Sequence, residues 1–101
     1  MKFCAAIDLG ASSGRIAVGS LDSGSLIIQE VHRFKHEAKV TDSGGLHWEW
    51  SKIVDEVKTG LLMAQKLGEI ISVGIDTWAV DYGLLDIQGN LIEEPYCYRD
   101  S

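Results

Sequence analysis

A short run of small and polar residues near the start of the chain, residues 8–15, has the composition of a phosphate-binding loop. Gly10 and Gly14 permit tight turns and close approach of the backbone to a ligand. Two serine hydroxyls and Arg15 add hydrogen-bond donors and a positive charge. A lone carboxylate beside a polyphosphate would be repelled, so Asp8 suits such a site chiefly through a Mg²⁺ ion, held directly or through its water shell.

The same run also has an interpretation without any ligand. It links two predicted strands, whereas the phosphate loops of Rossmann folds and P-loop proteins open a helix, so it is neither of those motifs. A Gly-Ser hairpin in which Asp8 caps the turn fits the residues as well. The spacing alone leaves both interpretations open.

Polar and aromatic residues gather a second time at residues 74–83, where a predicted buried strand ends. In open α/β sheets, ligands bind beyond the carboxyl ends of the strands. An exposed Trp78 would stack on a sugar ring, while neighbouring carboxylates and a hydroxyl would bind the hydroxyl groups of the sugar. The alternative is that Trp78 belongs to the core and Asp81 caps a turn, and the residues alone do not decide.

Two smaller groups receive structural interpretations. His32 and His36 are four residues apart where a predicted strand runs into a loop, and this spacing is not expected to place both on one face as in a helix. No metal site is predicted there. Trp48 and Trp50 come just before a predicted helix and are interpreted as packing residues rather than a binding face.

Short apolar runs bounded by turn signals predict the strands that position both groups. These strands are expected at residues 3–9, 15–20, 26–34, 70–75, 80–85 and from residue 91. The first is nearly all apolar, which predicts a strand buried on both faces. The first three predict an antiparallel meander, while residues 35–46 predict a loop and residues 86–90 a turn.

Residues 51–67 predict one helix between the third and fourth strands. Its apolar face recurs at steps of three, four and three, at Val54, Val57, Leu61 and Ala64. Ser51 is the predicted N-cap, and Gly68 follows the last turn. Because a helix between strands favours a right-handed crossover, the next strand is predicted to lie parallel to an earlier one.

Composition limits the class of protein. The chain has 101 residues, 46% hydrophobic and 24% charged, which fits one small globular domain. A formal net charge of −6 argues against nucleic acid and anionic membrane surfaces as partners, but not against a nucleotide. Cys4 and Cys97 are predicted to be buried free thiols. The start lacks a signal-peptide pattern and no run of about 18 apolar residues occurs, so a cytoplasmic location is expected.

Taken together, the two groups resemble motifs of the FGGY carbohydrate kinases. The run AIDLGASSGR at residues 6–15 is similar to the first phosphate motif of that family. More specific segments resemble the subgroup of the family that phosphorylates L-rhamnulose: EVHRF at 30–34, HW at 47–48, GIDTW at 74–78, VDYGLLD at 80–86, GN at 89–90 and YRDS at 98–101. The resemblance covers nearly the whole chain.

This resemblance implies an α/β fold of the ribonuclease-H-like, actin-like ATPase type, with a mixed sheet in the order β-β-β-α-β-β-β. Residues 1–101 would be part of the amino-terminal domain of a two-domain kinase. The last segment, residues 96–101, has charged residues directly after a predicted apolar strand. We interpret this as a cut within a longer chain. A chain of this length is expected to be inactive alone and to self-associate.

The resemblance also implies the ligands, which are ATP, Mg²⁺ and L-rhamnulose, whose 1-hydroxyl would receive the γ-phosphoryl group. Asp8 would help to hold Mg²⁺, and the catalytic base is expected beyond Ser101. The ATP phosphates would contact Gly10, Ala11, Ser12, Ser13, Gly14 and Arg15, and the sugar would contact Trp78, Ala79 and Asp81. The subgroup usually has glycine where this chain has Ala79. Another ketose kinase of the family, or a non-catalytic nucleotide-binding module of the same fold, are the alternatives.

Overall fold

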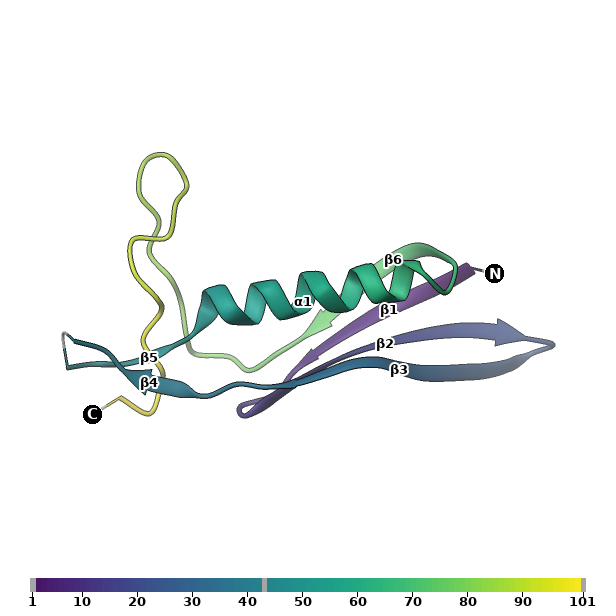
Figure 1. The fold of residues 1–101 in the computed structure, drawn as a ribbon, viewed down its shortest axis with the longest axis horizontal. Coiled ribbons are helices and arrows are strands. Elements are labelled where there is room, and N and C mark those ends of the chain that lie inside the picture. Colours follow the sequence, from purple (N-terminus) through teal and green to yellow (C-terminus); the bar gives the residue numbers. More distant parts are fainter. Residues whose placement is uncertain (1, 43, 101) are drawn as a thin grey trace.

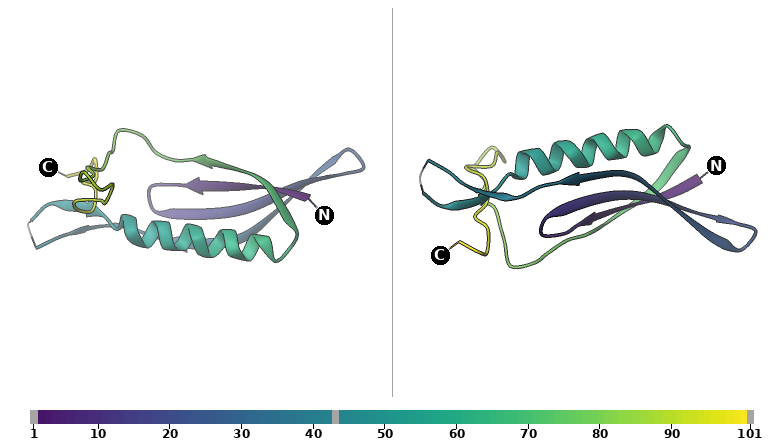
Figure 2. Two further views of the ribbon diagram at one scale, coloured as in Figure 1. Left: turned by 90° about the horizontal axis from the view of Figure 1, so that it is seen from above. Right: turned by 60° about the horizontal axis from the view of Figure 1, so that its bottom comes forward.

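One helix lies across one face of a four-stranded sheet, and a short two-stranded ribbon with a long loop extends from one end (Figures 1 and 2). The computed structural model describes residues 2–42 and 44–100, with principal extents of 54 × 28 × 20 Å. The elements are β1 (Lys2–Leu9), β2 (Ser13–Asp22), β3 (Ser25–Lys35), β4 (Ala38–Val40), β5 (Leu46–Trp48), α1 (Trp50–Gln65) and β6 (Glu69–Asp76). The predicted α/β class is therefore confirmed.

The first three strands form the predicted antiparallel meander. β2 and β3 are joined by a two-residue turn, in which Ser23 and Gly24 both have positive φ, at 52° and 84°. Such turns match the right-handed twist of the strands on either side, and glycine adopts positive φ without steric cost. The hairpin extends well beyond the helix (Figure 1).

The strand after the helix, β6, pairs with β1 in parallel, as predicted, and completes the order β3-β2-β1-β6. The register pairs Ile7 with Ile75 and Asp8 with Asp76. α1 lies between β5 and β6 in the sequence and packs on β1, β2, β3 and β6. Both β1 and β6 therefore end at the same edge of the sheet.

The core lies between α1 and one face of the sheet. Its central cluster consists of Ile7, Leu9, Ile16, Phe34 and Ile53. β1 alternates between buried and exposed residues from Cys4 onward, so the prediction of burial on both faces was wrong. Within the described residues, only the helix covers this sheet, and it covers one face. For the same reason Cys4 is exposed, whereas Cys97 is buried, and both thiols are free.

The helix starts one residue before the predicted start, and its N-terminus is capped differently. Ser51 lies inside the first turn instead of capping it. The carboxylate of Glu94 accepts hydrogen bonds from the backbone N–H of Ser51, at 3.2 and 3.3 Å, and from its hydroxyl. A residue 43 positions later thus caps the helix, which local sequence could not indicate.

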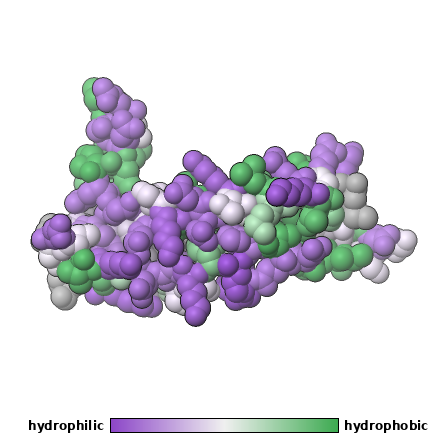
Figure 3. All heavy atoms as spheres, viewed as in Figure 1, coloured by the Kyte–Doolittle hydropathy of each residue, from purple (hydrophilic) through white to green (hydrophobic). Residues whose placement is uncertain are grey.

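The predicted apolar face of the helix is confirmed in part. Ala64 is buried, and Val57 and Leu61 are partly buried against the core cluster. Ile53 and Gly60 are also buried in the helix–sheet interface, and the spacing argument missed them. Ile71, Val73 and Ile75 of β6 are exposed, although the register pairs Val73 and Ile75 with Ala5 and Ile7, which are buried. Figure 3 has the view of Figure 1, and apolar residues gather in the right half of its visible surface, where Figure 1 shows α1 and β6, as well as on the loop at the upper left.

Residues 77–100 do not form the two strands predicted there. Residues 80–85 and the return segment make a single bridge, between Leu85 and Leu91, around the turn predicted at residues 86–90. Conversely, the predicted loop at residues 35–46 contains β4 and the start of β5. After the bridge at Leu91, the chain returns to β5, where the backbone N–H of Trp48 donates to the carbonyl of Pro95 at 2.8 Å. No helix in the described part of the chain is long and apolar enough to span a bilayer.

Gly60→Ala is predicted to destabilise the fold even though alanine favours helix. A Cβ at Gly60 would lie 2.7 Å from both Cδ1 and Cγ1 of Ile16. The helix-propensity gain is about 1 kcal/mol, whereas overpacking a tight core costs about 1–3 kcal/mol. Urea unfolding should show a net loss of roughly 1 kcal/mol, with exposed Thr59→Ala as the control. A gain in stability would show that the helix can move away from the sheet at no cost.

Candidate functional site

The parallel pairing of β1 and β6 brings the two predicted groups of residues together. Asp8 and Asp76 are neighbouring Cα partners at the ends of their strands. The glycine–serine loop, residues 10–15, follows β1 and includes the first three residues of β2, and Thr77 and Trp78 follow β6. Parallel strands leave a sheet at the same edge, which is where ligands bind in open α/β sheets. The two groups therefore belong to one candidate site.

The two charged residues of the loop region bind each other. Arg15 donates to Oδ2 of Asp8 from Nη2 at 2.8 Å and from Nε at 3.1 Å. Its third nitrogen, Nη1, donates to the hydroxyl of Ser13 at 3.2 Å. The Asp8 side chain is 53% exposed, so the pair is accessible from solvent. A carboxylate and a guanidinium that face solvent together provide both signs of charge at this edge.

The charges continue across the sheet. Arg15 is the rung partner of Arg33 on β3, and Arg33 forms an ion pair with Glu30 at 2.6 Å. The hydrogen bond from Arg33 lowers the pKa of Glu30 below its ordinary value, and the charges of Arg33 and Arg15 lower it further. Both side chains of this second pair are exposed, so it contributes little to stability. It does hold a second guanidinium near the loop.

Gly10 and Gly14 have different structural roles in the loop. The N–H of Gly10 bonds the carbonyl of Ser13 at 2.8 Å, which closes a tight turn. A Cβ at Gly14 would lie 2.3 Å from Cζ of Phe34, whose ring packs directly over the glycine. Gly14 is thus required by core packing, whatever ligand the loop binds.

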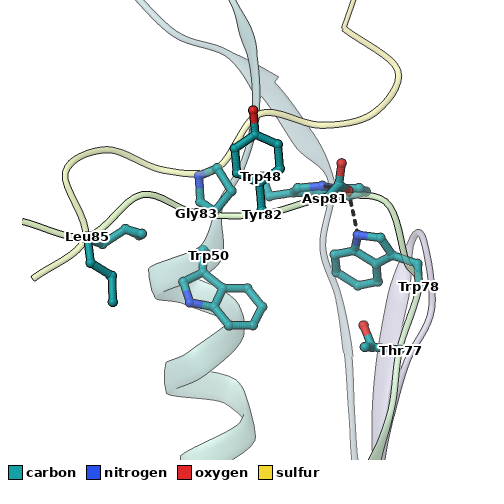
Figure 4. A pocket seen from close by; sticks show the side chains of 10 residues that line it. Trp48, Trp50, Thr77, Trp78, Asp81, Tyr82, Gly83 and Leu85 are labelled. Atoms are coloured by element: carbon teal, nitrogen blue, oxygen red, sulfur yellow. Dashed lines mark hydrogen bonds between the residues drawn. The ribbon is translucent and has the colours of Figure 1, made fainter. Parts of the chain in front are cut away.

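Two indoles share one carboxylate oxygen on the other side of the site. Trp78 and Trp48 each donate their Nε1–H to Oδ2 of Asp81, both at 2.7 Å. The ring centroids of the two tryptophans are 4.6 Å apart. Figure 4 shows Trp78 with its indole nitrogen directed at Asp81. We call Trp48 and Trp78 the tryptophan pair.

A cavity of about 360 Å³ opens beside the tryptophan pair. Its lining is mostly aromatic and apolar: Trp48, Trp50, Thr77, Trp78, Asp81, Tyr82, Gly83, Leu85, Leu91 and Pro95. We call it the tryptophan pocket (Figure 4). Trp48 is only 2% exposed, which agrees with the packing role predicted for it, but both Trp48 and Trp50 also line the pocket.

The structure supports parts of both interpretations of Trp78. The side chain is partly buried and packs against the core cluster, yet it also lines the pocket. Asp81 lines the pocket too, with Oδ2 occupied by the indoles. Ala79 is exposed and lies outside the set of lining residues. The next residue, Val80, has φ of 72°, an unfavourable conformation for a β-branched residue.

His36 connects the two halves of the site, and the sequence analysis missed it. Its Nε2 lies 2.8 Å from the carbonyl oxygen of Gly10, and its ring stacks on Trp78 at 5.6 Å. The expectation that His32 and His36 do not share a face was wrong, because alternate residues of a strand lie on one face. Their rings flank that of Phe34, at 5.9 and 6.1 Å. Among residues 2–42 and 44–100, no three His, Cys, Asp or Glu side chains gather as a metal site.

Comparison with curated proteins identifies relatives over nearly the whole chain. It is 49% identical over 96 residues to a rhamnulokinase of Bacillus subtilis (strain 168), with 94% of this chain covered. It is 43% identical to one of Klebsiella pneumoniae (strain 342) and 42% identical to one of Ligilactobacillus salivarius (strain UCC118), with 99% of this chain covered in both cases. No family model matches the chain.

The resemblance to rhamnulokinases that the motifs indicated is thereby confirmed. The chain spans about a fifth of the length of these relatives: 20% of the first, and 21% of the other two. The similarity therefore concerns one part of each relative, and it extends over both the glycine–serine loop and the tryptophan pair of this chain.

Replacing Asp81 is predicted to loosen both tryptophans at once. Hydrogen bonds to a charged acceptor contribute about 1.5–3 kcal/mol each, and Asp81→Leu removes two of them. Asp81→Asn keeps a neutral oxygen acceptor, so its loss of unfolding free energy should be smaller. Urea unfolding and near-ultraviolet circular dichroism measure the two effects, with exposed Asp55→Asn as the control for charge. An unchanged aromatic signal in Asp81→Leu would contradict the shared-acceptor role.

Proposed function

We propose that the chain, which resembles rhamnulokinases, is part of the first domain of an ATP-dependent sugar kinase of the FGGY family. The fold would be of the ribonuclease-H-like type. The whole enzyme would transfer the γ-phosphoryl group of ATP to the 1-hydroxyl of L-rhamnulose. The observation that carries this proposal is the Asp8–Asp76 pairing, which puts the glycine–serine loop and the tryptophan pocket at one sheet edge.

The loop is suited to the phosphates of ATP. Backbone N–H groups of the glycine–serine loop and its serine hydroxyls would donate to phosphate oxygens. Arg15 already presents its guanidinium at this edge, paired with Asp8. When a phosphate binds, the guanidinium would turn from the carboxylate to the phosphate oxygens, because a bidentate Arg–phosphate contact is a strong charge-assisted bond.

Asp8 fits the magnesium ion that accompanies ATP. Mg²⁺ in kinases is typically held by one or two carboxylates together with phosphate oxygens and waters. Asp8 offers one half-exposed carboxylate beside the loop, and releasing Arg15 to the phosphates would free the Oδ2 that it now occupies. When bound, magnesium would neutralise charge on the β- and γ-phosphates.

The tryptophan pocket is suited to the sugar. Sugar rings have an apolar face that stacks on indoles, and Trp50, Trp78 and Tyr82 line this cavity. Asp81 would act here mainly by fixing the orientation of the tryptophan pair through Oδ2. The exposed backbone around Ala79 would approach the hydroxyl groups of the sugar, next to Trp78.

This part of the enzyme would contribute binding and alignment rather than proton transfer. In phosphoryl transfer most of the catalysis comes from positioning and charge stabilisation. The base that takes the proton of the sugar hydroxyl is proposed to lie beyond residue 101, in the second half of the cleft. Asp76, Asp81 and Asp100 are not proposed as that base.

The chain by itself is proposed to be inactive and to self-associate. β6 is an edge strand of the sheet, and Ile71, Val73 and Ile75 on it are 56%, 50% and 65% exposed. Exposed apolar patches and open strand edges favour association with other chains. In the whole protein, later segments would cover this surface.

The proposed substrate is tested by assaying the whole protein against a panel of ketoses, with glycerol as an additional acceptor. The kcat/KM for ADP release should be highest with L-rhamnulose and lower with D-xylulose, D-ribulose and glycerol. A preference for another ketose would identify a different kinase of the family, and no turnover at all would favour a non-catalytic nucleotide-binding module.

Ala79→Gly, which removes one methyl group beside the proposed sugar site, should leave the KM for the sugar unchanged or lower it.

Asp8→Asn is predicted to lower kcat by at least about tenfold, since charge stabilisation by a bound metal contributes several kcal/mol in the transition state. The KM for the sugar should change little. Asp55→Asn, on the exposed side of the helix, is the control for lost charge. If only the KM for the sugar rose in Asp8→Asn, the carboxylate would belong to the sugar site instead.

A further inference from the structure

The side chain of His36 lies where the two halves of the site meet. It follows the last residue of β3 and is 3% exposed. Its ring nitrogen Nε2 bonds the carbonyl of Gly10 at 2.8 Å, and its backbone N–H bonds the carbonyl of Ser12 at 3.1 Å. Two hydrogen bonds therefore attach His36 to the glycine–serine loop.

The other side of the same ring contacts the tryptophan pair. The imidazole stacks on Trp78 with 25° between the planes and meets Trp48 edge to face, both at 5.6 Å between centroids. These two indoles are themselves fixed by Asp81. A continuous set of contacts thus runs from the Gly10 carbonyl through one imidazole to the lining of the tryptophan pocket.

The hydrogen bond to Gly10 fixes which ring nitrogen of His36 is the donor. A carbonyl oxygen only accepts, so Nε2 must carry the hydrogen that is donated to Gly10. The other nitrogen, Nδ1, is buried and has no hydrogen-bond partner among the described residues. The imidazole therefore acts as a donor to the loop through Nε2.

We propose that His36 is a positioning residue that sets the placement of the glycine–serine loop relative to the tryptophan pocket. The proposal rests on the proposed function, in which the loop holds the phosphates and the pocket holds the sugar. In-line transfer requires the attacking hydroxyl and the phosphoryl group to be aligned, and a displacement of about 1 Å can cost roughly 100-fold in rate. His36 would fix that alignment without touching either reactant.

The packing around His36 makes it a rigid connection. His32, Phe34 and His36 are alternate residues that share one side of the chain, and their rings follow one another at 5.9 and 6.1 Å. Phe34 also packs on Gly14 at the start of β2. Phe34 therefore holds the imidazole from the core side, in addition to the loop and the tryptophan pair.

Three variants of the whole protein test the proposal by amide hydrogen exchange, which needs no activity. His36→Leu fills the same space with an apolar side chain but removes the donor to Gly10. His36→Gln returns an N–H near the position of Nε2. His32→Leu is the matched control, because His32 bonds Glu56 on the helix, 3.1 Å away, rather than the loop. Deuterium uptake is followed in the peptides that contain residues 8–15 and residues 76–83.

His36→Leu should raise the exchange rate of both peptides together by about tenfold, the effect of losing one buried hydrogen bond. His36→Gln should restore most of the protection in residues 8–15, and His32→Leu should leave both peptides unchanged. Faster exchange in only one peptide, or equal effects of His36→Leu and His32→Leu, would overturn the proposal.

Steady-state kinetics of the same variants separate the positioning role of His36 from the proposed kinase function. With an active enzyme, His36→Leu should lower kcat by about 10–100-fold, with little change in the KM for ATP or for the sugar, and His36→Gln should recover part of the loss. A change confined to KM would contradict a positioning role. If the wild-type protein phosphorylates no ketose, the proposed function fails, while the exchange experiment still decides whether His36 couples the loop to the pocket.

Discussion

The arrangement of the whole molecule depends on the parallel pairing of β6 with β1. The register that joins Asp8 to Asp76 also joins Ile7 to Ile75, so it sets the faces of both strands. A slip of one residue would turn every side chain of β6 to the opposite face. Polar and apolar residues would then exchange places at the edge where the strands end. The candidate site therefore depends on this one register of β1 and β6, because the register decides which side chains face each other where the two strands end.

Local patterns predicted the parts of the fold that local interactions determine. Short apolar runs bounded by turn signals predicted the meander, and the helical spacing that ends at Ala64 predicted α1. The segment 77–100 could not be predicted in this way. Its apolar residues resemble strands, but Leu85, Leu91 and Pro95 line a pocket, and the segment makes a short contact with β5. Similarly, the capping of the helix by Glu94 joins residues that are far apart in the sequence.

The site was predictable in its residue types but not in its connections. The loop near Arg15 and the aromatic segment at Trp78 were identified from composition and spacing, and their proximity follows from the parallel strands. The sharing of Asp81 by two indoles was not predictable, because Trp48 and Trp78 lie on different elements. Neither was the role of His36, which stands in a polar segment and gains its partners only through packing.

The wide separation of β1 and β6 in the sequence has a consequence for the order of folding. β1, β2 and β3 are consecutive and form hairpins, whose short loops close at little entropic cost. β6 comes only after the helix, so its pairing with β1 requires a long loop to close, and contacts of this kind form slowly. On a ribosome, the meander would emerge first and expose the free edge of β1 until β6 is synthesised. The two halves of the candidate site are brought together by the last of these steps, so a chain that stalls before it would hold a folded hairpin and no site.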